Sequence, residues 1–181
     1  GFYYKPRINM EILEEYAEGL VCLSGCLNGV MSQNVLNNRQ DKAEAFAKKC
    51  SEIFDDGSFF VELQNHGLEE QKKIFEPMYD MAKRLDLPVV ATNDSHYLYA
   101  EDSEAHDALL CIGTGKIVKD ENRLKYTSDQ FYVKSGDEMA EIFTGKFEEA
   151  LDNTIKIAEM CDFEITFDSY KLPDYEVPEG H

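Results

Sequence analysis

The 181-residue sequence combines 43% hydrophobic with 30% charged residues, a balance typical of globular rather than disordered proteins. Acidic residues outnumber basic ones by 36 to 18, giving a formal net charge of −18. Because proteins hold nucleic acid through cationic contacts to phosphates, this chain alone is not expected to bind DNA without metal ions or basic neighbours. No apolar run approaches the roughly 20 residues of a membrane span, so no membrane partner is expected.

The chain opens on Gly1 without a methionine, so we expect one domain, or a large part of one, from a longer polypeptide.

The cysteines indicate the cellular compartment. The five cysteines are Cys22, Cys26, Cys50, Cys111 and Cys161. Their odd number and wide spacing indicate free, buried thiols in a reducing cytosol, and hence a cytoplasmic protein. A structural zinc site at Cys22 and Cys26 is disfavoured, because no second paired motif accompanies them.

Short apolar runs alternate with longer amphipathic segments in the first half of the chain. Strands are predicted at residues 20–23, 59–63 and 88–92, and helices at 41–54 and 68–85. The order strand, helix, strand, helix, strand is typical of α/β architecture with a parallel sheet and right-handed crossovers.

The second half has a different pattern. The predicted elements are a helix at 100–112, a loop at 113–126, a short strand at 130–133 and helices at 136–143 and 147–160. Ser135 and Glu138 have the spacing of a capping box, which predicts a helix start at this point. Prolines punctuate residues 171–180, which indicates an extended linker.

Two polar clusters follow the second and third predicted strands. His66 ends the first cluster, and Asp94 and His96 lie two residues apart in the second. Because ligand sites form at the carboxyl ends of parallel strands, and strand side chains alternate, these groups are predicted to meet at one edge. Imidazole and carboxylate groups suit zinc, manganese or iron. Spacing leaves other readings open: a hydrogen-bonded packing histidine at 66, and a cap or an ion pair at Asp94.

Other candidates are weaker on the sequence alone. His106 lies on a predicted helix and is interpreted as structural. Ser24 and Cys26 end the first predicted strand, but no general base is close to either in the sequence, so a nucleophile there is disfavoured.

Five runs of sequence taken together carry a family resemblance. They are KPR at 5–7, CLSGCL at 22–27, ELQNHG at 62–67, ATNDSHY at 91–97 and EAHDALLCI at 104–112. They closely resemble the PHP (polymerase and histidinol phosphatase) domain of the bacterial DNA polymerase III alpha subunit. LP at 172–173 and VPEG at 177–180 resemble that family's passage toward the polymerase body.

The resemblance implies a fold and a ligand set. The fold is α/β, the later portion of a distorted β/α barrel of PHP type with trailing helices, occupying residues 1–168, with an exit linker at 169–181. The implied metal ligands are His66, Asp94 and His96, with Glu62 and Asn93 in supporting positions. The metal would be zinc or manganese. The earlier His-x-His motif and the aspartate-rich polymerase centre, which uses magnesium, are expected outside this chain.

The implied parent is a DNA-directed DNA polymerase, a nucleotidyltransferase of DNA replication. Its PHP site would be a metal-dependent phosphoesterase serving 3′–5′ exonuclease proofreading, and no catalysis is expected from this chain alone. The alternative is a structural metal-binding scaffold that docks a separate proofreading exonuclease. A free-standing PHP phosphoesterase is a third, weaker reading. The expected partners are DNA, contacted through the parent polymerase, and other replisome subunits.

Overall fold

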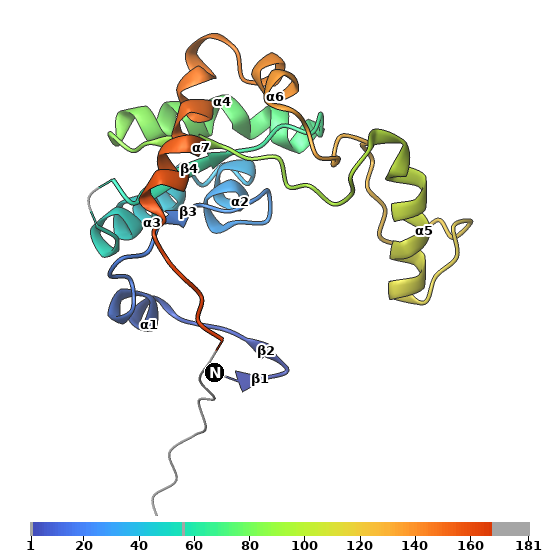
Figure 1. Cartoon of the computed structure of the whole chain (residues 1–181), viewed down its shortest axis with the longest axis horizontal. Coiled ribbons are helices and arrows are strands. Elements are labelled where there is room, and N and C mark those ends of the chain that lie inside the picture. The colour runs from blue at the N-terminus through green and yellow to red at the C-terminus, as the bar shows by residue number, and fades with distance from the viewer. Residues whose placement is uncertain (1, 56, 168–181) are drawn as a thin grey trace, which may run out of the picture.

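A computed structural model describes residues 2–55 and 57–167 (Figure 1). The predicted exit linker at 169–181 lies outside the described residues, and the domain boundary at 168 stays a prediction. The chain opens with a short antiparallel pair, β1 (Phe2–Tyr3) and β2 (Lys5–Pro6), followed by α1 (Met10–Glu15).

The centre of the molecule is a three-stranded parallel sheet in the order β3 (Cys22–Leu23), β4 (Phe59–Leu63) and β5 (Val89–Ala91). The α/β class is therefore confirmed, whereas closure into a barrel stays a prediction. β4 lies in the middle and is almost entirely buried, which suits its apolar residues; Glu62 is its one charged residue and is half-buried. The predicted strand at 20–23 is shorter than expected, because only Cys22 and Leu23 pair with β4.

Two amphipathic helices connect the strands as predicted. α3 (Gln40–Ile53) buries Ala43, Ala47 and Cys50, and α4 (Glu69–Arg84) buries a stripe that includes Ile74 and Met78. These residues form one hydrophobic core with β4 and β5. The sequence reading missed α1 and α2 (Val30–Leu36), both of which are short.

The predicted strand at 130–133 is wrong. This segment makes a single bridge, between Tyr97 and Tyr132. Two backbone hydrogen bonds form this bridge: the Tyr97 amide donates to the Phe131 carbonyl over 3.3 Å, and the Val133 amide donates to the Tyr97 carbonyl over 3.1 Å. Side chains bind neighbouring carbonyls: Asn93 donates to the Tyr132 carbonyl over 2.6 Å, and Lys134 donates to the Gln130 carbonyl. The pairing does not extend beyond this single bridge, so the segment is not a strand.

The rest of the chain is helical with long connections. It contains a 3-10 turn η1 (Ala100–Asp102), then α5 (Ser103–Thr114), α6 (Gly136–Ile142), a second 3-10 turn η2 (Gly145–Phe147) and α7 (Glu148–Met160). α7 crosses the sheet beside β5, and its Asn153 side chain donates to the Val89 carbonyl over 2.7 Å. Figure 1 shows α5 standing apart from the sheet, at the end of two segments without regular structure.

The capping box predicted at Ser135 is confirmed, and it gives α6 a pH-dependent start. The Ser135 side chain accepts from the Glu138 amide, and Glu138 accepts from the Ser135 amide over 2.8 Å. The Ser135 amide, the Tyr132 hydroxyl and the Ser135 hydroxyl, in that order, lower the pKa of Glu138 from 4.5 to about 2.

Because this carboxyl has a lower pKa when folded, its contribution is present above its ordinary pKa and is lost as the pH falls from 4.5 toward 2. We expect Glu138→Gln to lower the thermal unfolding midpoint at pH 6, with the difference from wild type shrinking by pH 2.5. Thermal unfolding at the two pH values measures this. Glu141→Gln, at an exposed carboxylate of the same helix, is the matched control. A Glu138 effect that is equal at both pH values would contradict the prediction.

In the described part of the chain, no helix is long and apolar enough to cross a membrane. All five cysteines are free thiols, as expected, but only Cys50 and Cys111 are buried and Cys161 is exposed.

Candidate functional site

His66 lies just beyond the end of β4, and its side chain is buried and hydrogen-bonded at both ring nitrogens. It is 1% exposed. Its Nε2 lies 2.6 Å from the Asn93 carbonyl oxygen, and its Nδ1 lies 2.8 Å from the amide nitrogen of Gln71. Since a carbonyl can only accept, the ring carries its proton on Nε2 and accepts at Nδ1. Burial is the main cause that lowers the pKa of His66, which favours this neutral form.

The same histidine ties three segments together at the carboxyl edge of the sheet. Gln71, at the start of α4, also accepts from the His66 backbone amide over 2.7 Å. The Ser128 hydroxyl donates to the His66 carbonyl, and the Phe131 ring stacks on the imidazole with centroids 4.3 Å apart. His66 thereby links the ends of β4 and β5 to the segment before α6.

Asp94 and His96 meet by a route other than the predicted one. Asp94 has a φ of 42°, in the left-handed region, so the extended strand does not continue through it. Even so, its Oδ1 lies 3.4 Å from Nε2 of His96. Both side chains are partly exposed, so the burial that would demand a charge partner for Asp94 is absent.

Aromatic side chains surround His96. Its ring centroid lies 5.0 Å from that of Tyr126, 5.5 Å from that of His106 and 5.6 Å from that of Phe131. The Tyr126 hydroxyl is 3.4 Å from His96 Nε2. His106 is helical as predicted, and the structure adds it to this cluster.

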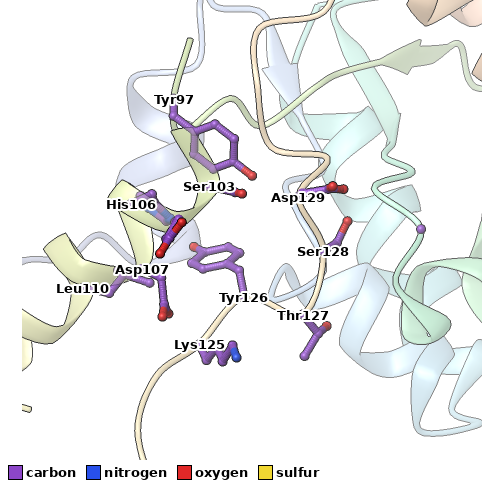
Figure 2. A pocket seen from close by; sticks show the side chains of 12 residues that line it. Tyr97, Ser103, His106, Asp107, Leu110, Lys125, Tyr126, Thr127, Ser128 and Asp129 are labelled. Carbon is purple, nitrogen blue, oxygen red and sulfur yellow. The ribbon is translucent and has the colours of Figure 1, made fainter. Parts of the chain in front are cut away.

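A polar cavity of about 580 Å³ opens between α5 and residues 125–129 (Figure 2). Tyr97, His106 and Tyr126 line it, so it lies beside His96. Figure 2 shows the Tyr126 ring between the α5 side chains and the facing segment that carries Ser128 and Asp129. A small polar ligand in this cavity would be within reach of the His96 cluster.

Glu62 and Asn93, predicted in supporting positions, both connect neighbouring strand ends. The Glu62 carboxylate accepts from the Gly25 amide over 3.0 Å, from the Gln64 side-chain amide over 3.0 Å and from the Thr92 hydroxyl. It therefore joins the ends of β3, β4 and β5. Asn93 accepts from His66 through its backbone carbonyl, while its side chain binds the Tyr132 carbonyl.

Comparison with known proteins finds the same family that the five runs of sequence resemble. Residues 1–66 match the family model described as the PHP domain. The chain is 45% identical to the DNA polymerase III subunit alpha of Treponema pallidum over 178 residues, which cover 98% of this chain and 15% of the relative. That of Borreliella burgdorferi is also 45% identical, over 98% of this chain and 15% of the relative. That of Thermus aquaticus is 43% identical, over 99% of this chain and 15% of the relative.

The chain is a relative of the DNA polymerase III alpha subunits and contains PHP-domain sequence. The predicted family is therefore confirmed. The chain spans about 15% of the length of these polymerase relatives. The PHP match ends at His66, so Asp94 and His96 lie beyond the matched residues.

The described residues of this chain do not by themselves form a complete metal-binding site. In residues 2–55 and 57–167, no three His, Cys, Asp or Glu side chains are grouped so that they could hold a metal ion. Both ring nitrogens of His66 are engaged by protein groups. Asp94 and His96 are the accessible pair, and their role as ligands stays a prediction.

The sequence analysis did not identify several residues that contact His66 or His96 at the carboxyl edge of the sheet. Gln71 and Phe131 hold His66, and Tyr126 contacts His96. Burial, and after it the charge of Asp94, raises the pKa of Tyr126. A polar residue five positions after His66, in the first turn of a predicted helix, could have indicated Gln71. Phe131 gave no local signal, because it joins the cluster from far along the chain.

Proposed function

We propose that this chain works as a segment of a DNA-directed DNA polymerase, the replicative polymerase III alpha subunit. The observation that carries this is the 45% identity to two such subunits over 98% of the chain. DNA contacts come from other parts of the parent, since this segment has a net charge of −18. Other replisome subunits are partners of the parent, and magnesium serves its polymerase centre.

Within the parent, Asp94 and His96 supply two ligands of a divalent zinc or manganese centre. Their Oδ1 and Nε2 atoms lie 3.4 Å apart, both side chains are accessible and a polar cavity adjoins them. Carboxylate and imidazole are the donor types such metals take. The remaining ligands come from parts of the parent polymerase outside this chain. His66 can join them only if its hydrogen bond to Gln71 or to Asn93 breaks. The activity proposed for the centre is 3′–5′ exonuclease proofreading.

A second function is favoured by the way His66 is held. A buried histidine with both nitrogens hydrogen-bonded stabilises a fold and offers no free lone pair. The segment would then be a scaffold that positions other domains, or docks a separate proofreading exonuclease on its acidic surface.

One experiment on the full-length parent separates the two functions. The double variant Asp94→Asn/His96→Ala is compared with wild type and with Asp152→Asn, a matched change at an exposed position on α7. Bound metal is measured by elemental mass spectrometry, and proofreading is measured on a primer with a mismatched 3′ end.

For the exonuclease we expect the double variant to lose metal and to excise the mismatch at least about tenfold more slowly, with matched primers still extended. Loss of metal with a lower melting temperature and unchanged excision would establish the scaffold instead. Unchanged metal and unchanged excision would show that neither residue is a ligand.

A further inference from the structure

The side chain of Lys134 is folded inward, whereas most lysines extend into solvent. Its amine donates to the Gln130 carbonyl and, over 3.3 Å, to Oδ1 of Asn93. It also lies 4.1 Å from the centroid of the Tyr132 ring, which is a cation–π distance. A lysine gives up much rotational freedom when it is held in this way. The fold therefore specifies the place of this amine, which connects the segment before α6 to the end of β5.

The start of α6 fixes the aromatic ring that the amine contacts. The Tyr132 hydroxyl donates to the Glu138 carboxylate over 2.7 Å, and the same carboxylate caps the helix. Burial lowers the pKa of Lys134, whereas the negative charges of Glu138 and Asp129 oppose this shift and favour the protonated amine. A protonated amine has three donors and no lone pair. Lys134 can therefore orient other groups, but it cannot itself bind a metal ion.

The Asn93 side chain carries this contact to the turn at Asp94. Its Nδ2 donates to the Tyr132 carbonyl over 2.6 Å and to the Ser95 hydroxyl over 3.0 Å. The bond to Ser95 spans Asp94. Because the Lys134 amine can only donate, it keeps the Asn93 Oδ1 toward itself and directs Nδ2 to the other two partners. The Asn93 amide is thereby fixed in one of its two possible orientations.

Asp94 has the unusual backbone that these bonds surround. Its φ of 42° lies in a region that residues with a side chain occupy only where their surroundings fix it. The Asn93 amide is anchored on one side of Asp94. On the other side, the His96 backbone amide donates to the Phe131 carbonyl over 2.7 Å. The turn between these two anchors brings Asp94 Oδ1 to 3.4 Å from His96 Nε2.

We infer that Lys134 is a positioning residue, which acts through Asn93 to fix the left-handed turn at Asp94. The turn in its place holds Asp94 beside His96. The inference rests on the proposed function, because it assumes that this pair binds metal in the parent. Removing a group that orients metal ligands from behind commonly costs about 10–100-fold in metal affinity. Lys134 acts in this way and touches neither metal nor substrate.

The nuclear Overhauser effect between the amide and α protons of Asp94 tests this geometry in the 181-residue chain, in metal-free solution. A left-handed backbone brings these two protons closest together, so we expect Lys134→Met to lower the signal at least about twofold. Lys134→Arg, which keeps a cation and its donors, should retain most of it. Lys42→Met, at an exposed lysine of α3, is the matched control and should leave it unchanged. An unchanged signal in Lys134→Met would overturn the inference.

A second variant keeps the test decisive if circular dichroism shows that Lys134→Met does not fold. Asn93→Ala removes the amide through which Lys134 acts, so it should lower the Asp94 signal to the same degree. Where both variants fold, combining them should lower the signal no further than Asn93→Ala alone. A full signal in Asn93→Ala, or an additional loss in the combined variant, would refute a route through Asn93.

The parent polymerase supplies the functional measurement. Metal affinity, measured by competition with a chelator, should fall at least about tenfold in Lys134→Met and much less in Lys134→Arg. If Lys134→Met kept its affinity while Asp94→Asn/His96→Ala lost metal, the metal centre would stand and the positioning role of Lys134 would be wrong. If Asp94→Asn/His96→Ala kept its metal, the proposed ligands would be wrong, and the Asp94 signal would still decide whether Lys134 fixes the turn.

Discussion

Replacing Phe60 with alanine is expected to lower the free energy of unfolding by about 3–5 kcal/mol. Phe60 is fully buried on the central strand β4, where it lies opposite Leu23 in the ladder. Removing the ring leaves a cavity that flanking strands can fill only in part, so lost burial and a residual void add together. Denaturant unfolding followed by circular dichroism measures the change.

Phe163→Ala is the matched control for this substitution. Phe163 is 86% exposed, so the same chemical deletion removes little buried surface. We expect its effect to stay within about 0.5 kcal/mol. Similar losses at the two positions would mean that β4 is not the centre of the core.

Replacing His66 with alanine is expected to cost about 2–4 kcal/mol of stability, with or without metal. The substitution leaves the side-chain amide of Gln71 without its acceptor and the Asn93 carbonyl without its donor, in a buried setting. Each such loss costs about 1–3 kcal/mol. It also removes the stacked contact with Phe131. Denaturant unfolding in the presence of a chelator isolates the structural contribution from any metal.

His96→Ala, measured under the same conditions, is the control for His66. His96 is partly exposed, and we expect its loss to cost less than about 1 kcal/mol when metal is removed. If the chelator abolished the difference between the two variants, His66 would act through a metal rather than through the hydrogen bonds described above.

Local sequence predicted the elements well where one physical signal dominated. β4 was predicted with its observed ends, because its short apolar run stands between two amphipathic helical segments. α4 was predicted within a residue at each end from its amphipathic period. The short helices α1 and α2 were missed, because six or seven residues contain too little of a helical period to detect.

The sequence by itself determined the family, the α/β order and the strand ends that carry His66, Asp94 and His96. Local runs and periodicity carry this information, because strand ends of a parallel sheet share one edge. Only the tertiary structure decided which groups these side chains contact. The left-handed backbone at Asp94 ends the extended strand, and the bond from His66 Nε2 goes to Asn93, 27 residues further along the chain. Hydrogen-bond partners of that kind are set by packing, which no local pattern records.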